Sequence, residues 1–300
     1  MKPGILYGGN YGSFSWKAVE LAQAQNSELR GLPPIESLDP PTAIKRFWNR
    51  EYSHAVIPVF NPTLGGPIPS AKSGFLEAGC PLPPEGTPLN EWVDVFIKLH
   101  QDEIFGEPLY LPIEFSIHAL PGVKPENITR LVAYSMAVDQ CRKGIQRVVG
   151  RAFEEVPYSD TGKAAQDLSK FGADPAYKIQ EPESALLEPL SHTAILGPAW
   201  CDKLFGLQTL WGGVQDLPGG NVTTFIVFRN LSSLGISESS AMDVLENCGP
   251  LAGSLTAMGR FLINTTLMKF FVRIFYFCLF RSAVLKQCVN ASQKKFLKRL

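Results

Sequence analysis

Alternation of strand-like and helix-like segments over the first 230 residues is the feature that most constrains the fold. Short apolar runs, such as residues 5–7 and 55–60, end at turns, and segments with helical spacing lie between them. Strands that alternate with helices form mainly parallel sheets with helical crossovers. Hydrophobic residues make up 45% of the 300 residues, which is enough for one large or two medium domains. The sequence therefore predicts an α/β fold.

The periodicity places each element of this fold. We expect strands over residues 5–7, 55–60, 107–115, 128–132, 153–157, 192–196 and 223–229. We expect helices over residues 15–25, 44–50, 90–100, 136–150, 161–171 and 198–205. Residues 62–90 carry many Gly and Pro and are expected to form exposed loops. A polar break at residues 230–239 is the expected boundary of this block.

Charge and cysteine usage exclude several classes of protein. Lys plus Arg and Asp plus Glu number 28 each, and no basic stripe is present, so we expect no nucleic-acid partner. The six cysteines form no CxxC pair, which favours reduced thiols over a disulfide or zinc framework. The first residues show no apolar run typical of a signal peptide. These observations predict a cytoplasmic protein without a metal site.

Residues 261–285 are rich in Phe, Leu and Ile, a composition that can indicate a membrane span. Lys269, Arg273 and Arg281 interrupt the stretch. Charges near the centre of a bilayer are costly. We therefore expect a buried or misassembled strand region here and no membrane partner.

Two loop segments carry candidate binding groups. A Gly-rich turn at residues 217–220 precedes Asn221, and two adjacent hydroxyls, Thr223 and Thr224, begin the last predicted strand. Polar side chains at the mouth of a buried strand are well placed to meet a ligand in a cleft. The other segment, residues 8–15, aims backbone N–H groups and hydroxyls at a helix N-terminus, a natural carboxylate site. In the simplest alternative, the threonines bond the backbone and the turn is an ordinary strand–helix connection.

Four segments, taken in order, resemble motifs of the prephenate dehydratase family. Residues 9–15 are similar to its G-P-x-G-T-F-S, residues 56–62 to V-P-I-E-N-S, residues 158–165 to S-T-A-x-A-A, and residues 215–225 to I-x-D followed by N-x-T-R-F. Gln140–Cys141 and Leu204–Leu207 match further short patterns of the family. The chain departs from the motifs at Phe60 for Glu, Pro62 for Ser, Tyr134 for His, Asp160 for Ser and Thr224 for Arg. Because the order is kept across about 230 residues, the chain is identified as a member of the family.

The resemblance implies a two-lobed α/β domain, similar to type II periplasmic binding proteins, with its site between the lobes. This catalytic domain would cover residues 1–232, with one lobe of residues 1–108 and 205–232 and another of residues 109–204. Residues 242–266 resemble the ACT regulatory domain, which implies a small, incomplete α+β domain over residues 240–300. In the alternative, they form an amphipathic helix between two strands. Family members form homo-oligomers, and we expect the same here.

The resemblance also implies roles for individual residues. Thr223 would be the catalytic residue and would donate to the leaving hydroxyl of the substrate. The expected substrate-binding residues are Ser13, Ser15, Asn61, Thr161, Asn221, Thr224 and Phe225, and the expected phenylalanine effector site includes Gly249, Leu251 and Asn264. Thr224 offers one neutral donor where an Arg would give bidentate bonds to a carboxylate. Asp160 would repel an anionic substrate unless it is paired, for example with Lys163. No metal or organic cofactor is expected.

Three functions are compatible with the motifs and their departures. The first is decarboxylating dehydration of prephenate, or of arogenate, in L-phenylalanine biosynthesis. The second is a diverged activity on prephenate or a related compound in secondary metabolism, such as decarboxylation without aromatisation. The third is a non-catalytic binding protein. The losses at Phe60, Pro62 and Thr224 favour the second and third.

Overall fold

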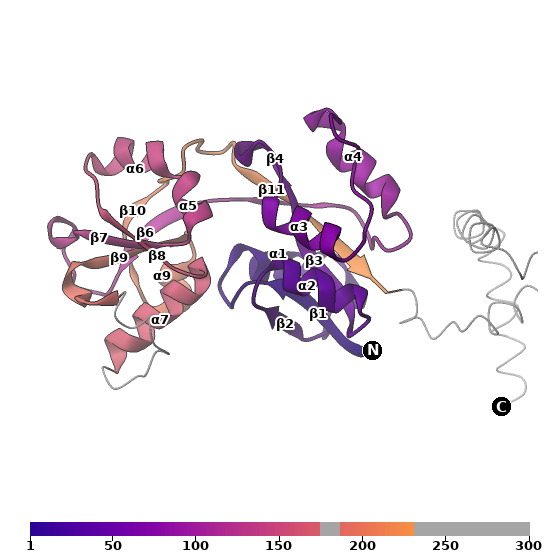
Figure 1. Cartoon of the computed structure of the whole chain (residues 1–300). Coiled ribbons are helices and arrows are strands. Elements are labelled where there is room, and N and C mark those ends of the chain that lie inside the picture. The colour runs from indigo at the N-terminus through magenta and orange to yellow at the C-terminus, as the bar shows by residue number, and fades with distance from the viewer. Residues whose placement is uncertain (175–186, 231–300) are drawn as a thin grey trace, which may run out of the picture. The chain divides into compact units, whose positions relative to one another are not determined.

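The structure is a computed structural model that describes residues 1–174 and 187–230 (Figure 1). Residues 1–230 form one compact unit. The predicted ACT-like domain, its effector residues Gly249, Leu251 and Asn264, and the apolar stretch 261–285 all lie outside the described residues.

The unit contains two β-sheets. The first has the order β2-β1-β3-β11-β5, with the short β4 paired to β3. Its strands are β1 (Lys2–Gly8), β2 (Pro34–Ser37), β3 (Tyr52–Asn61), β4 (Gly66–Pro67), β5 (Leu109–Pro112) and β11 (Val222–Arg229). β1 pairs in parallel with both β2 and β3, whereas β11 runs antiparallel to β3 and β5. The short β4 is also antiparallel to β3, so the expected parallel strands are joined by antiparallel ones in a mixed sheet.

The second sheet has the order β10-β6-β9-β7-β8. Its strands are β6 (Phe115–Ala119), β7 (Arg130–Ala133), β8 (Glu154–Pro157), β9 (Thr193–Pro198) and β10 (Gln208–Gly212). The pairs that β7 forms with β8 and β9 are parallel, and β6 is antiparallel to β9 and β10. This sheet is also mixed.

Two connections join the sheets, as Figure 1 shows. The chain leaves the first sheet after β5 and returns before β11. The resemblance predicts these crossings near residues 108 and 205. They lie a few residues later, because β5 pairs with β11 in the first sheet and β10 pairs with β6 in the second. The two-lobed α/β architecture is confirmed.

Helices cover the faces of both sheets and enclose three apolar clusters. They are α1 (Phe14–Gln25), α2 (Pro40–Trp48), α3 (Pro69–Glu77), α4 (Leu89–Leu99), α5 (Ser135–Asp139), α6 (Arg142–Val149), α7 (Thr161–Ala173) and α9 (Cys201–Phe205). One cluster joins α1 to the near faces of both sheets and includes Phe115 and Phe225. A second lies under α2, α3 and α4 and includes Phe47 and Phe228. The third lies between α7 and the second sheet.

Several elements differ from the sequence-based expectation for identifiable reasons. The predicted strand over residues 107–115 is two strands, β5 and β6, in different sheets. The predicted helix over residues 136–150 is split at Gln140 and Cys141 into α5 and α6. Helix α3 lies in the segment expected to be loop; its Gly74 lets the helix approach α2, since a Cβ there would lie 2.7 Å from the Pro41 Cα.

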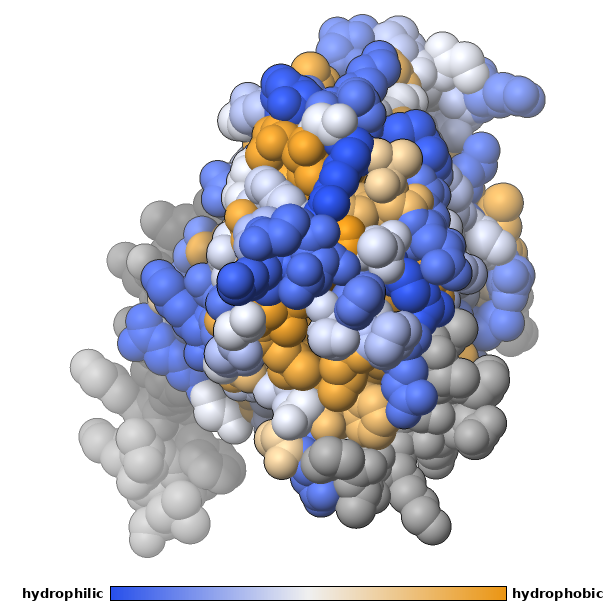
Figure 2. All heavy atoms as spheres, turned by 90° about the vertical axis from the view of Figure 1, so that its left-hand side faces the viewer, coloured by the Kyte–Doolittle hydropathy of each residue, from blue (hydrophilic) through white to orange (hydrophobic). Residues whose placement is uncertain are grey.

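Figure 2 shows apolar groups interspersed with polar groups over the face turned to the viewer. On the second sheet, the rings of Phe153 and Trp211 lie 6.0 Å apart, and the Arg151 guanidinium lies over both. Within the described residues, no helix is long and apolar enough to cross a membrane. Cys80, Cys141 and Cys201 are buried free thiols, as expected for reduced cysteines.

Candidate functional site

A buried network of uncharged side chains joins the two sheets at the start of β11. The Asn61 amide donates to Oγ1 of Thr223 at 2.7 Å and to Oδ1 of Asn221 at 2.9 Å. The Asn221 amide in turn donates to Oε1 of Gln140, the residue after α5, at 2.9 Å. We call these four residues the amide corner. Asn61 and Asn221 are 1% and 3% exposed, so each polar atom there must find a partner.

The orientation of the Asn61 amide is fixed by the backbone beside it. Asn61 ends β3, and its Oδ1 accepts from the N–H groups of Thr63 at 2.8 Å and Leu64 at 3.2 Å, which caps the short 3₁₀ turn Pro62–Leu64. The Nδ2 group must therefore face Thr223 and Asn221. Thr223 is then an acceptor in this bond, and its own hydroxyl proton is free to be donated to another acceptor.

The amide corner lies where the two connections between the sheets run side by side. The Ile113 N–H donates to the Asn221 carbonyl at 2.8 Å, and the Phe115 N–H donates to Oε1 of Gln215 at 3.1 Å. Backbone N–H groups of one connection thus donate to the other connection beside the site.

Thr223 and Thr224 point to opposite faces of β11, because successive strand residues alternate. Thr223 shares its face with Asn221 and Phe225, and Thr224 shares its face with Ile226. Thr224 is paired across the strands with Phe60, whose ring stacks on Trp92 at 5.7 Å. Two of the five departures from the family motifs, Phe60 for Glu and Thr224 for Arg, are therefore direct cross-strand neighbours. Substrate contacts of Thr224 and of the buried core residue Phe225 stay predictions.

The loop between β1 and α1, residues 9–13, has most of its backbone donors occupied. Gly9 N–H donates to the Ser37 carbonyl, Tyr11 N–H to Oε1 of Glu36 at 3.0 Å, and Ser13 N–H to the Asn10 carbonyl. Ser13 is the N-cap of α1, and its Oγ accepts from the Trp16 N–H at 3.2 Å. The donors expected to meet a ligand are thus used largely within the chain.

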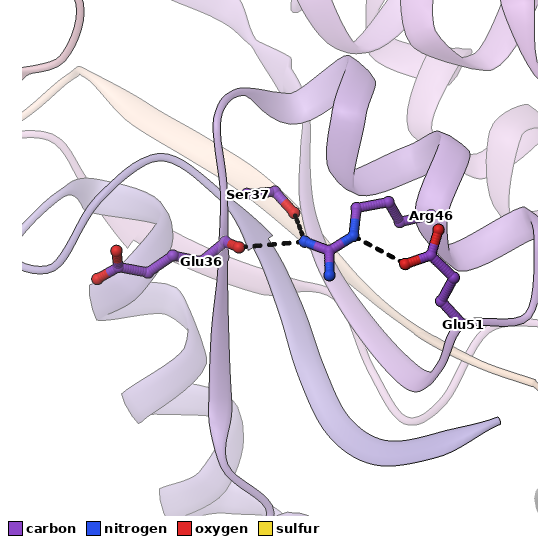
Figure 3. Close-up of polar contacts among 4 residues, drawn as sticks. All are labelled: Glu36, Ser37, Arg46 and Glu51. Atoms are coloured by element: carbon purple, nitrogen blue, oxygen red, sulfur yellow. Dashed lines mark hydrogen bonds and ion pairs between the residues drawn. The ribbon is translucent and has the colours of Figure 1, made fainter.

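Arg46 holds the strand that presents Glu36 to this loop (Figure 3). Its guanidinium donates to the Glu36 carbonyl at 3.2 Å and to Oγ of Ser37 at 3.0 Å, and pairs with Glu51 at 3.0 Å. The Glu36 carboxylate points away from Arg46 in Figure 3, and it accepts from the Tyr7 hydroxyl at 3.2 Å. Burial and this carboxylate raise the pKa of Tyr7 well above its usual range.

Asp160 closes the other side of the loop. It is the N-cap of α7, where its Oδ1 accepts from the Lys163 N–H at 2.9 Å, and it also accepts from the Gly162 N–H. Both the backbone N–H and the side chain of Asn10 donate to the same carboxylate. Burial raises the pKa of Asp160, and these four bonds oppose the shift. The Lys163 ammonium forms an ion pair with Asp167 at 2.7 Å.

The remaining predicted substrate-binding residues lie near these two regions. Ser15 is a buried residue of the first turn of α1, and Thr161 is buried as the first residue of α7. The structure brings Asn61, Asn221 and Thr223 together in one network and leaves Ser13, Ser15 and Thr161 at the helix N-termini beside the loop. Their contacts with a substrate stay predictions.

Three residues important to this geometry were not among the predicted site residues. Gln140 and Asn10 stand out in the sequence only as parts of short motifs, and no local pattern marks Glu36 as a contact of the loop. Their partners are Asn221, Asp160 and Tyr11, which are 81, 150 and 25 residues away in the sequence. Only tertiary structure brings such pairs together.

The three buried histidines, His54, His100 and His118, are poorly suited to act as a general acid. Burial lowers the pKa of His100 and His118, and burial with the neighbouring Arg229 charge lowers that of His54 to about 4. In each of the three, the lowered pKa disfavours the protonated imidazolium that a general acid requires. In the described part of the chain, no group of three His, Cys, Asp or Glu side chains could hold a metal ion.

Comparison with known families and proteins gives a consistent result. The family model described as prephenate dehydratase matches residues 83–233, half of the chain. Arogenate dehydratase 5 (chloroplastic) of Arabidopsis thaliana is 26% identical over 223 residues, which cover 74% of this chain and 41% of that protein. Prephenate dehydratase of Mycolicibacterium gilvum is 24% identical over 231 residues, covering 75% and 60%.

A solved structure shares the fold. The prephenate dehydratase of Arthrobacter aurescens, in complex with L-Phe, is similar with a TM-score of 0.51 and 20% identity over 76% of this chain and 60% of that one. The chain thus spans between 41% and 60% of the length of these three relatives.

Proposed function

We propose that this chain, which belongs to the prephenate dehydratase family, catalyses the decarboxylating dehydration of prephenate or arogenate. The observation that carries the proposal is the bond from the Asn61 amide to Oγ1 of Thr223. Because the Thr223 oxygen accepts this bond, its hydroxyl proton can be donated to a ligand beside the buried polar network that spans both sheets. The product from prephenate would be phenylpyruvate, a precursor of L-phenylalanine.

The reaction needs few groups from the protein. The electrons of the bond to the departing carboxylate form a ring double bond, the ring becomes aromatic, and the hydroxyl group leaves with one added proton as water. Prephenate and one proton thus give phenylpyruvate, carbon dioxide and water. Thr223 donates a hydrogen bond to the leaving oxygen, a role that a neutral hydroxyl can fill because aromatisation supplies the driving force.

The amide corner orients this donor. Because Asn61 donates to both Thr223 and Asn221, and Asn221 donates to Gln140, each side chain is held by its neighbour. Such preorganisation matters more than charge in a buried site, since the donor does not need to reorient during the reaction. A lyase mechanism of this kind uses no metal or organic cofactor.

A second candidate function is supported by the residues on the face of β11 opposite Thr223. Phe60 and Thr224 replace two charged motif residues, and their packing makes the underside of the site apolar. Decarboxylation without aromatisation releases only carbon dioxide, a ring carbon takes up a proton and the ring hydroxyl is retained, so the charged residues lost at these two positions need not assist its departure. The Thr223 hydroxyl and its partners could then hold the retained ring hydroxyl, which favours this activity over a fully vestigial binding protein.

One experiment separates the candidates. The purified 300-residue chain is incubated with prephenate or arogenate, and the products are followed by ultraviolet absorbance and mass. Phenylpyruvate from prephenate, or phenylalanine from arogenate, supports the proposed lyase. A non-aromatic decarboxylated product supports the diverged enzyme, and binding without any product supports a binding protein.

Regulation by phenylalanine is a further part of the proposal. The related Arthrobacter aurescens structure contains L-Phe, and the sequence predicts an effector site with Gly249, Leu251 and Asn264. We expect phenylalanine to change the rate of the full chain, and the substitution Asn264→Ala to remove that response. A rate that is insensitive to phenylalanine would contradict this part alone. The homo-oligomeric state and the cytoplasmic location likewise stay predictions.

A further inference from the structure

The loop between β1 and α1 and the N-terminus of α7 are in direct contact. A Cβ at Gly162 would lie 2.7 Å from both the Ser13 nitrogen and the Tyr11 oxygen. Trp200 adds a bond from its indole nitrogen to the Gly12 carbonyl at 2.8 Å. Real Cβ atoms do not come this close to backbone, so only glycine fits at position 162 without a shift of the loop.

A single carboxylate lies at the centre of this contact. Asp160 accepts from the backbone N–H and the side chain of Asn10 on the loop and from the N–H groups of Gly162 and Lys163 on α7. The loop also approaches it at Gly9, where a Cβ would lie 3.0 Å from Oδ2 of Asp160. Four donors from two elements converge on this carboxylate, as they would on the carboxylate of a bound ligand.

Helix α5 runs between this contact and the amide corner, with Tyr134 at its first end and Gln140 at its last. Its N-cap, Tyr134, is close enough to Asp160 for that charge, together with burial, to raise the pKa of the Tyr134 hydroxyl. The residue after its last turn, Gln140, accepts from Asn221. At a rise of 1.5 Å per residue, the six steps from Tyr134 to Gln140 span roughly 9 Å. This is about the length of a six-membered ring with a three-carbon side chain.

Resting on the proposed function, we propose that Asp160 determines substrate specificity by acting as a built-in carboxylate at the β1–α1 loop. It occupies the donors of Asn10 and disfavours a substrate that brings an uncompensated second carboxylate to this end of the site. Arogenate carries an ammonium group where prephenate carries an oxo group. That cation offsets the charge of its side-chain carboxylate and is attracted by Asp160. The chain therefore prefers arogenate to prephenate.

The test measures binding and does not depend on turnover. Dissociation constants of prephenate and arogenate are determined by calorimetry for the full-length chain, Asp160→Ser and Asp160→Asn. The native chain binds arogenate more tightly. Both variants free donors of Asn10 and remove the negative charge, so the ratio of the two constants moves toward prephenate by roughly tenfold, the effect of one charge-assisted bond.

Asp39→Asn is the matched control. Asp39 caps α2 through the Thr42 N–H at 2.8 Å, and its charge also acts on Tyr134, but Asn10 does not bond to it. This variant loses an equal charge and weakens a similar cap, and its ratio of constants stays within about twofold of the native value. An Asp39→Asn shift as large as that of Asp160→Ser would show a general charge effect and would overturn the proposal.

Other outcomes are equally decisive. An unchanged ratio in Asp160→Ser and Asp160→Asn, or no binding of either compound by any protein, overturns the inference. If Asp160→Ser does not fold, Asn10→Ala is tested instead. This variant removes the side-chain donor of Asn10 and keeps the Asp160 carboxylate, so it must retain the preference for arogenate. Binding that shifts as expected without any product would support Asp160 as the specificity determinant and reject the proposed lyase activity.

Discussion

The amide corner and the β1–α1 loop both join the two sheets, but they use opposite chemistry. The corner consists of Asn61, Asn221, Thr223 and Gln140, all uncharged, and leaves one hydroxyl proton to donate. The loop is held between two carboxylates, Glu36 and Asp160, which accept from its donors. A neutral network can present a donor to a reacting group, whereas a carboxylate that accepts four bonds holds its donors in place and acts on a ligand only through its negative charge. We therefore assign the chemistry to the corner and selection to the loop.

The largest effect is expected at Thr223. Thr223→Ala removes the donor and should lower kcat by about 10²–10⁴-fold, the usual contribution of a positioned proton donor. Thr223→Ser keeps the hydroxyl and should retain most of the rate. Steady-state assays of product formation measure both. If Thr223→Ala were as active as the native chain, the corner would not be the site of chemistry.

Charge placed beneath the corner should have the next largest effect. Phe60→Glu buries an unpaired carboxylate against Trp92 and should lower the free energy of unfolding by about 3 kcal/mol. Because Thr224 is the cross-strand neighbour, Phe60→Glu with Thr224→Arg should recover about 1–3 kcal/mol relative to the sum of the single variants. Denaturant titration of the four proteins gives this coupling. Purely additive losses would show that the two positions act independently.

A methyl group at Gly162 tests how closely the loop and α7 must pack. Gly162→Ala places a Cβ 2.7 Å from loop backbone atoms and should cost about 1–3 kcal/mol, seen as a lower Tm. Gly172→Ala is the control on the same helix: its Cβ would meet the flexible Leu120 side chain, so the loss should be smaller. Equal losses in the two variants would mean that the loop contact has no special rigidity.

The smallest effect concerns the pH dependence of stability. It comes from His54, which belongs to neither the amide corner nor the β1–α1 loop. Burial and Arg229 lower the pKa of His54 to about 4, from an ordinary value near 6.5. Folding favours the neutral form of His54. Its contribution to the free energy of unfolding is therefore fully present above about pH 6.5 and is lost as the pH falls through about 4. After solvent screening, the loss is about 1–2 kcal/mol. His54→Phe should reduce the drop in Tm between these pH values; an unchanged drop would contradict it.

Much of the fold was predictable because its core strands follow their local pattern. The runs at β1, β3 and β11 are apolar, and those at β3 and β11 are also rich in β-branched residues. The helix α7 starts at the predicted residue 161, and α1 starts one residue before the predicted residue 15, after its N-cap Ser13. β2 was missed because it is a four-residue edge strand that follows a proline and itself begins with one, and its pairing partner is supplied by β1. α3 was missed because Pro, Ser and Gly weaken its helical signal, and only packing on α2 stabilises it.

The candidate site was predictable in composition but not in geometry. Motif positions identified Asn61, Asn221 and Thr223, which the structure joins in one network. The sequence could not show that Thr224 and Phe60 are cross-strand neighbours on the other face, since register depends on the bulge between the strands. Nor could it show that the partners of Asp160 include Asn10, because that contact joins two sheets.

A crystal structure of the chain with phenylpyruvate tests the central claim most directly. The claim is that ligand chemistry takes place at the amide corner. We predict an oxygen or ring atom of phenylpyruvate next to Thr223, with any polar contact to Oγ1 at about 2.6–3.2 Å, and the bond from Asn61 to Thr223 intact. Phenylpyruvate bound elsewhere, with Thr223 still enclosed by protein atoms, would contradict the account.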